Sequence, residues 1–246
     1  MDRLYIVMPA FNEEAAIRQV IDDWYPIVEE HHGDGASRLV VVNDGSTDRT
    51  QEILDTMQED HPLLHVITKE NGGHGEAIRT GYQCAVDNHA DYIFQTDSDG
   101  QTNPAEFHAF WRRREAFDLI IGNRKHRVDG ANRVMVARAE RLAVMYMFHV
   151  NLADANAPFR LMKGSWLEKS LPRVPENFFL VNVLLAVIAA KQKRKILYLP
   201  ISFRPRQGGT NSMNMKTIAK AGFRALRDFP RANRRLNRQL RKQQRP

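Results

Sequence analysis

Hydrophobic residues form short continuous runs, and in the first half of the chain these runs alternate with amphipathic stretches. The runs cover residues 4–8, 39–42, 63–67, 92–94, 119–121 and, in the second half, 195–199. Continuous apolar runs indicate strands that are buried on both faces, which is typical of a parallel sheet. The pattern therefore predicts an α/β fold with a mostly parallel sheet.

The stretches between the runs carry apolar residues at helical spacing. In residues 13–30 these are Ala16, Ile17, Val20, Ile21 and Trp24. Further helices are expected at about 46–57, 75–86, 105–114, 134–150 and 177–190, and a loop at 200–214. The alternation predicts helices on both faces of the sheet, in a single domain over residues 1–223 that is followed by a basic tail at 224–246.

Clusters of unusual polar residues directly follow four of the apolar runs. They are Pro9-Ala10-Phe11-Asn12-Glu13, Asn43-Asp44-Gly45-Ser46, Asn71-Gly72-Gly73-His74-Gly75 and Asp97-Ser98-Asp99-Gly100-Gln101. One such cluster is ordinary turn chemistry. Because parallel strands bring their carboxyl ends to one edge of a sheet, four clusters in register predict a shared ligand site.

Asp97 and Asp99 stand two residues apart at a predicted strand end, so both carboxylates can point to the same side of an extended chain. Two like charges held together favour a compensating cation, and Mg²⁺ or Mn²⁺ takes one or two carboxylates together with substrate phosphates. The pattern predicts a metal diphosphate ligand. An exposed acidic turn is the alternative interpretation of an isolated Asp-x-Asp.

Several protein classes are disfavoured by what the sequence contains. The first strand is followed by Met8-Pro9-Ala10-Phe11-Asn12 and not by the Gly-x-Gly-x-x-Gly of a dinucleotide fold, and no Gly-x-x-x-x-Gly-Lys-Ser/Thr occurs. The single cysteine, Cys84, excludes an intrachain disulfide framework. The longest apolar run, residues 178–190, is shorter than a membrane span, and no signal peptide is expected at the start.

Charge is concentrated at the end of the chain. Residues 224–246 contain nine Arg and Lys and one Asp, so the net charge of this tail is +8. The whole chain has a net charge of +7, so residues 1–223 carry −1 and are close to neutral. A dense basic tail favours an anionic partner, either phospholipid headgroups or nucleic acid. A solvated, partly helical terminus is the alternative.

The clusters together resemble the inverting glycosyltransferases of family 2, which have the GT-A fold, and within them the polyprenyl (dolichyl) phosphate mannosyl- and glucosyltransferase branch. The resemblance covers about residues 5–215 and extends beyond the four clusters. It includes the segment from Gly73 to Gly81, Asp154 with Phe159-Arg160, and Arg204-Pro205-Arg206 leading to Gly209 and Ser212.

The resemblance implies a role for each matching residue. Pro9, Ala10, Asn12 and Glu13 resemble the loop that holds the donor nucleoside, Asp44 and Ser46 the residues that recognise base or ribose, and Gly75 and Arg79 the element beside the diphosphate. Asp97, Asp99 and Gln101 resemble metal ligands, with Ser98 between them in the donor site. Arg124, Arg138, Arg206 and Ser212 are expected at the acceptor phosphate, and Asp99, Asp154 and Arg206 are the expected catalytic residues.

The expected function is inverting transfer of a mannose or glucose unit from GDP- or UDP-hexose to a polyprenyl phosphate, with Mg²⁺ or Mn²⁺ as cofactor. Asp154 is the candidate base or orienting carboxylate. One alternative is a family 2 transferase that uses a saccharide hydroxyl as acceptor, and an alternative of another class is a basic-tailed nucleic-acid-binding protein. Nucleic acid is not expected, because the tail contains Phe229 but no interleaved aromatic platform, and no recognisable nucleic-acid-binding motif precedes it. We expect a cytoplasmic protein that associates peripherally with the inner face of the membrane.

Overall fold

A computed structural model describes residues 2–32, 34–124, 131–204 and 215–243, and it contains one seven-stranded sheet. The strand order is β3-β2-β1-β4-β6-β5-β7, and β6 alone runs antiparallel to its neighbours β4 and β5. The strands are β1 (Leu4–Ala10), β2 (Arg38–Asp44), β3 (Leu64–Lys69), β4 (Tyr92–Gln95), β5 (Leu119–Asn123), β6 (Arg160–Lys163) and β7 (Ile196–Pro200). The predicted mostly parallel sheet is confirmed.

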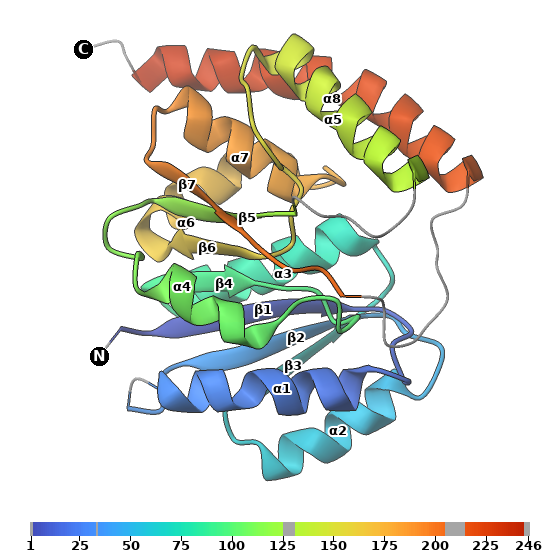
Figure 1. The fold of residues 1–246 in the computed structure, drawn as a ribbon, viewed down its shortest axis with the longest axis vertical. Coiled ribbons are helices and arrows are strands. Elements are labelled where there is room, and N and C mark those ends of the chain that lie inside the picture. The colour runs from blue at the N-terminus through green and yellow to red at the C-terminus, as the bar shows by residue number, and fades with distance from the viewer. Residues whose placement is uncertain (1, 33, 125–130, 205–214, 244–246) are drawn as a thin grey trace.

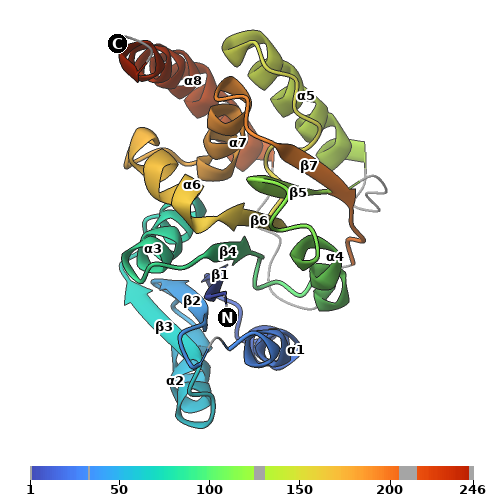
Figure 2. The ribbon, with the colours of Figure 1, turned by 90° about the vertical axis from the view of Figure 1, so that its left-hand side faces the viewer.

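Helices cover both faces of the sheet (Figures 1 and 2). One face carries α1 (Ile17–Glu30), α2 (Thr50–Asp60) and α4 (Phe107–Trp111), whose apolar residues form one core cluster. The other face carries α3 (His74–Asp87), α6 (Gly164–Ser170) and α7 (Val181–Lys191) in a second cluster. Alternate residues of β1 pack into the two clusters, because successive side chains of a strand point to opposite faces.

Two long helices form a further layer over α7. They are α5 (Ala131–Phe148) and α8 (Met215–Gln243), which lie side by side in Figure 1 and contact each other. Phe148 and Phe229 meet with ring centroids 5.2 Å apart, and Asn233 Nδ2 donates to the carbonyl oxygen of Met147 at 2.6 Å. Residues 224–243 of the expected basic tail are therefore a part of α8, and the apolar residues Phe229 and Leu236 among them are buried in the core.

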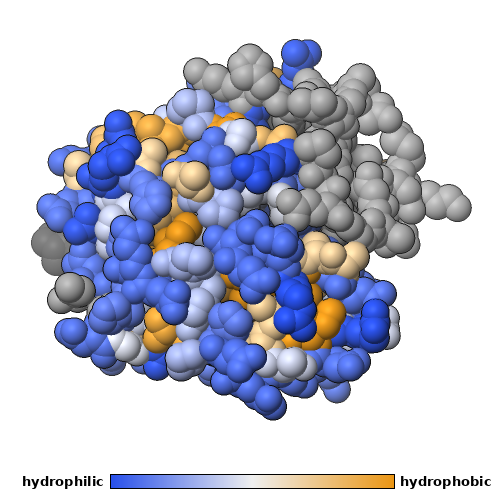
Figure 3. All heavy atoms as spheres, turned by 60° about the horizontal axis from the view of Figure 1, so that its bottom comes forward, coloured by the Kyte–Doolittle hydropathy of each residue, from blue (hydrophilic) through white to orange (hydrophobic). Residues whose placement is uncertain are grey.

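The surface that Figure 3 shows is mostly hydrophilic, with hydrophobic residues in small groups between charged ones. None of the helices in the described part of the chain is both long enough and apolar enough to cross a bilayer.

The sequence pattern locates most elements within a few residues, but it does not predict all of them. The antiparallel strand β6, the helix α6 and the short 3-10 helix η2 (Leu171–Arg173) were not predicted, and α8 was expected only as a basic tail that could be partly helical. The expected helix at 105–114 divides into the 3-10 helix η1 (Pro104–Glu106) and α4. Part of the expected loop at 200–214, residues 205–214, lies outside the described residues.

The sheet grows from β1 toward one edge with β2 and β3, and toward the other edge beginning with β4. The switch in the order of the strands therefore lies between β1 and β4, which are parallel neighbours. In an open α/β sheet this switch point leaves a crevice at the carboxyl ends of the strands, where ligands bind. The loops that follow β1, β2, β3 and β4 all begin at this edge, so the four polar clusters lie where the sequence predicts them.

Candidate functional site

The loops after β1 and β2 are joined by side-chain hydrogen bonds. Asn12 has a φ of 55°, a left-handed conformation that Asn tolerates better than most residues. Its backbone N–H donates to Ser46 Oγ at 3.0 Å, and its Oδ1 accepts from the N–H of Thr47 at 2.8 Å. Asn12 and Ser46 thus hold these two loops together, and their predicted contact with the donor stays a prediction.

Asp44 at the end of β2 is almost fully buried and holds the next loop. Its carboxylate accepts from the N–H of Gly72 at 2.9 Å and of Gly73 at 2.7 Å, and from Lys69 Nζ at 2.9 Å. Burial opposes the charge of Lys69, but hydrogen bonds and attraction to Asp44 and Glu76 outweigh burial and raise the pKa of Lys69. The predicted contact of Asp44 with base or ribose stays a prediction, and the structure adds a loop-ordering role.

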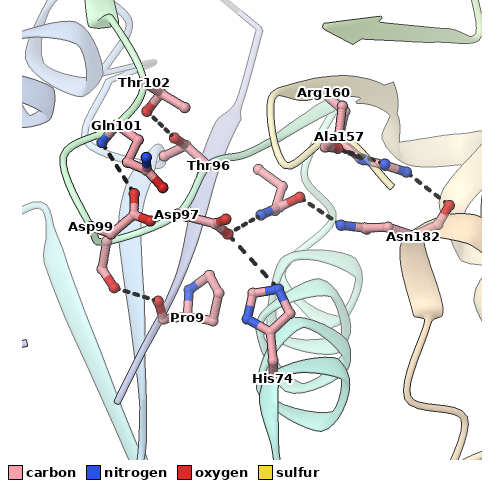
Figure 4. A network of polar contacts seen from close by, with 12 residues as sticks. Pro9, His74, Thr96, Asp97, Asp99, Gln101, Thr102, Ala157, Arg160 and Asn182 are labelled. Atoms are coloured by element: carbon pink, nitrogen blue, oxygen red, sulfur yellow. Dashed lines mark hydrogen bonds and ion pairs between the residues drawn. The ribbon is translucent and has the colours of Figure 1, made fainter. Parts of the chain in front are cut away.

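The segment after β4 carries the acidic pair. Asp97 is partly exposed, with Oδ1 3.9 Å from His74 Nε2 at the first residue of α3 and accepting from Gln95 Nε2 at 3.1 Å. Asp99 Oδ1 accepts from the N–H of Gln101 at 3.1 Å, and Gln101 Nε2 donates to the carbonyl oxygen of Arg204 at 3.0 Å. Figure 4 shows both carboxylates on the turn that follows β4.

This turn is anchored to the neighbouring strand. Ser98 is buried and its Oγ donates to the carbonyl oxygen of Pro9 at 2.8 Å, while Pro9 and Ala10 are the buried last residues of β1. Glu13 is also buried, and its N–H donates to Thr50 Oγ1 at 2.9 Å. The predicted donor-loop residues therefore lie together at the switch point.

Gly75 and Arg79, predicted beside the diphosphate, make contacts within the chain. A Cβ added at Gly75 would lie 2.4 Å from the carbonyl oxygen of Phe179, so the glycine is required for packing of α3 against the segment before α7. Arg79 Nη1 donates to the carbonyl oxygen of Val174 at 3.0 Å, which commits its guanidinium to the backbone there. Their contact with a diphosphate stays a prediction.

Arg124 and Asp154 form a bidentate ion pair. Arg124 Nε and Nη2 donate to Asp154 Oδ2 and Oδ1, each at 2.8 Å, and both side chains are mostly buried. Burial opposes the charge of Arg124, but Asp154, with Asp97 and Glu140, outweighs burial and raises its pKa. The ring centroid of Phe203 lies 5.5 Å from Cζ of the Arg124 guanidinium. The candidate base and a candidate phosphate ligand are thus each other's partners.

The other predicted acceptor residues are placed differently. Arg138 is exposed on α5, whereas Arg206 and Ser212 lie outside the described residues.

Three buried polar residues behind the acidic pair were missed by sequence reasoning. Asn182 Nδ2 donates to Gln95 Oε1 at 2.9 Å, and Tyr82 Oη donates to Asn182 Oδ1 at 2.8 Å. Gln95 in turn contacts Asp97, so a chain of hydrogen bonds runs from the core to the acidic pair (Figure 4). A signal was present, because Asn182 is the one polar residue in the apolar run 178–190.

The donor set of this edge suits a hard divalent cation. Carboxylate and amide oxygens are the ligands that Mg²⁺ and Mn²⁺ prefer, and Asp97, Asp99 and Gln101 offer such oxygens within one turn. Within the described ranges, no group of three or more His, Cys, Asp and Glu residues could hold a metal ion.

The family model described as "Glycosyl transferase family 2" matches residues 5–171. The undecaprenyl-phosphate mannosyltransferase of Micrococcus luteus is 25% identical over 89% of this chain and 90% of its own length. The polyprenol monophosphomannose synthase of Mycolicibacterium smegmatis is 24% identical over 90% of this chain and 85% of its own length.

A similar fold occurs in the glucosyl-3-phosphoglycerate synthase of Mycobacterium tuberculosis, solved in complex with Mn²⁺, UDP and glucosyl-3-phosphoglycerate. The TM-score is 0.68 at 20% sequence identity, over 93% of this chain and 80% of that one. The similarity confirms the predicted fold class, a GT-A-like single domain with a mostly parallel sheet between helices.

Proposed function

The chain belongs to glycosyltransferase family 2, and we propose that it transfers a hexose from a nucleotide sugar to a polyprenyl phosphate with inversion at the anomeric carbon. The observation that carries the proposal is the meeting of Asp97, Asp99 and the start of α3 at the switch point of the sheet. The similarity to two enzymes named for polyprenyl-phosphate acceptors supports the choice of acceptor.

The donor would lie across the loops after β1 and β2, with its diphosphate toward α3. The first backbone N–H groups of a helix carry partial positive charge and have no partners within the helix, so they favour an anion. The N–H groups of Gly72 and Gly73 just before α3 are held by Asp44, which fixes the direction in which the helix begins. GDP- and UDP-hexoses both fit this chemistry.

Asp97, Asp99 and Gln101 are the residues that would hold a divalent cation, Mg²⁺ or Mn²⁺. A bound cation would neutralise the charge that builds on the departing nucleoside diphosphate. Asp99→Ala should lower kcat by about 10²–10³, as does the removal of other groups that stabilise transition-state charge.

The acceptor phosphate would approach the arginine side of the site. We place it at Arg124 and Arg138, with Arg206 and Ser212 as further ligands. The guanidinium of Arg124 presents a planar fork that is now filled by Asp154, so phosphate binding there would exchange one anionic partner for another. A phosphate oxygen is already ionised, so it attacks with little general-base assistance, and Asp154 would then orient Arg124.

We further propose that the layer of α5 and α8 docks on an anionic membrane surface. Large apolar side chains are exposed on both helices: Leu142 (59%), Met145 (44%) and Tyr146 (76%) on α5, and Phe223 (75%) and Leu226 (59%) on α8. Exposed arginines of α8, such as Arg231, Arg234 and Arg238, lie on the same helical stripe as Phe223. Apolar insertion beside arginines is the chemistry of a helix in a membrane interface.

Turnover of nucleotide sugars tests the reaction. GDP- and UDP-linked mannose and glucose are each incubated with a short polyprenyl phosphate and with Mg²⁺, Mn²⁺ or a chelator, and the lipid product is analysed by mass and by anomeric NMR. We expect one donor to give an inverted, metal-dependent lipid-phosphate sugar. Asp99→Ala is compared with Asp22→Ala, which removes an exposed carboxylate on α1. A parallel reaction offers a saccharide acceptor, and transfer to its hydroxyl with none to the lipid phosphate would refute the proposed acceptor.

Sedimentation with vesicles tests the membrane surface. The triple variant Arg231→Gln, Arg234→Gln, Arg238→Gln should bind vesicles that contain phosphatidylserine about 100-fold more weakly, because each arginine contributes about 1 kcal/mol. The matched control exchanges three exposed arginines away from α8 for glutamine: Arg18, Arg112 and Arg113. Equal losses in both variants would show that net charge, and not this surface, governs binding.

A further inference from the structure

The hydrogen bonds behind Asp97 connect three elements that are distant in the sequence. Tyr82 comes from α3, Asn182 from α7 and Gln95 from β4, and the three donor–acceptor distances from Tyr82 to Asp97 are 2.8, 2.9 and 3.1 Å. Figure 4 shows the last two of these bonds leading from Asn182 to the carboxylate. The chain of bonds ends at Asp97 Oδ1, on the first carboxylate of the acidic pair.

These three side chains lie in the core. Tyr82 and Gln95 have no exposed surface and Asn182 is 2% exposed. Burying polar groups costs free energy unless each is hydrogen-bonded, and here each amide both donates and accepts within the chain. Apolar residues at positions 95 and 182 would fill the same space without that requirement, so a polar role is indicated.

In this chain of bonds, the donor and the acceptor of each bond follow from the last acceptor, the carboxylate of Asp97. An ionised carboxylate only accepts, so Gln95 must present its Nε2 to Asp97 and its Oε1 to the interior. Gln95 Oε1 requires Nδ2 of Asn182, and Asn182 Oδ1 then requires the hydroxyl proton of Tyr82. Burial raises the pKa of Tyr82 and keeps that proton in place. All donors therefore point toward Asp97.

The chain of bonds is anchored at its inner end. Arg160 Nη1 donates to the carbonyl oxygen of Asn182 at 2.9 Å, and this guanidinium is itself fully buried. The start of α7 is thus tied to β6, which pairs with β4 next to Gln95. Because its partners are packed on all sides, the amide of Gln95 has one orientation to offer.

We propose that Tyr82, Asn182 and Gln95 are positioning residues that hold Asp97 Oδ1 and so fix the carboxylate for the divalent cation. The proposal rests on the metal site of the proposed function. With Oδ1 engaged, Asp97 is restrained in one rotamer, and the entropy of ordering this ligand is lost on folding and not on binding of the metal. Partners of ligating carboxylates tune metal affinity in this way in other proteins.

Binding of Mn²⁺ to the full chain, followed by electron paramagnetic resonance with and without saturating GDP or UDP, tests the proposal. Gln95→Leu should weaken Mn²⁺ binding by about 10–100-fold, the usual effect of removing an outer partner of a metal ligand. Tyr82→Phe removes only a distant hydroxyl and should weaken it by a smaller factor, about 3-fold. Asn182→Asp replaces the donor to Gln95 by an acceptor and should weaken it more than Tyr82→Phe does.

Tyr25→Phe is the matched control. The hydroxyl of Tyr25 accepts from the N–H of Leu63 at 3.1 Å, in the core cluster on the other face of the sheet. Both Tyr→Phe variants remove one buried hydroxyl and should lose similar thermal stability, but only Tyr82→Phe should weaken Mn²⁺ binding.

The failures of the two proposals are distinguishable. If the wild-type protein binds no Mn²⁺ in the presence of either nucleotide, the metal site of the proposed function is wrong. If the wild type binds Mn²⁺ and Tyr82→Phe and Asn182→Asp bind it equally well, the positioning role is overturned. These two variants decide the question even where Gln95→Leu does not fold.

Discussion

Arg160 offers a sharp test of how the loop that carries Asp154 is held. Its side chain has no exposed surface, and its guanidinium donates to backbone carbonyl oxygens: Ala157 from Nε at 3.0 Å and Nη2 at 2.6 Å, Ala155 at 2.9 Å and Asn182 at 2.9 Å. Burial lowers the pKa of Arg160. The charge is therefore stabilised by carbonyl dipoles, among which those of Ala155 and Ala157 belong to no helix or strand.

Arg160→Met replaces the fork by an apolar side chain. A buried carbonyl left without a donor costs about 1–3 kcal/mol, so the Ala155 and Ala157 carbonyls together bring the loss to about 2–6 kcal/mol. Relief of the cost of burying a charge offsets part of it. We expect the free energy of unfolding to fall by about 2 kcal/mol, which is large against a total of about 5–15 kcal/mol.

Urea unfolding at pH 7 with fitted m-values measures this change, and hydrogen exchange of the amides at 152–157 shows whether the loop is loosened. Arg160→Lys keeps the charge but not the fork, so it should be destabilised as well. Arg112→Met, on the surface, should stay within about 0.5 kcal/mol of wild type. An Arg160→Met protein as stable as wild type, with unchanged exchange at the loop, would refute this reasoning.

Two further substitutions test packing and acid stability. A Cβ at Gly164 would lie 1.7 Å from the carbonyl oxygen of Ala90, so Gly164→Ala should lower the free energy of unfolding by about 1–3 kcal/mol; Gly222→Ala in α8, with open space around it, should not lower the thermal midpoint. Burial opposes ionisation of Asp48, but hydrogen bonds from Thr50 and Glu14 outweigh burial and lower its pKa. The stability that this carboxylate adds is present above its unfolded pKa of about 3.9 and is lost as pH falls through the lower folded value. Asp48→Asn should therefore be less stable than wild type by about 1 kcal/mol at pH 7, and urea titrations should show the gap closing below about pH 4; a gap that persists at pH 2 would contradict this.

The sequence by itself predicted the parallel sheet and the edge at which ligands would meet. Strands buried on both faces must be apolar throughout, so β1 and β2 are visible as runs, and their loops are visible as polar clusters. The acidic pair Asp97 and Asp99 could also be predicted, because two carboxylates in one turn are recognised without knowledge of distant residues. The family resemblance added the expected roles.

Tertiary structure decided which distant side chains pair. β6 is a short strand that begins with a buried arginine, so no hydrophobic period marks it, and its antiparallel direction depends on its neighbours β4 and β5. The ion pair of Arg124 with Asp154 joins residues 30 positions apart, and the hydrogen bond from Asn182 to Gln95 joins residues 87 apart. Periodicity reports only which face of an element is buried; the partner of a buried polar group is set by the packing of separate elements against one another.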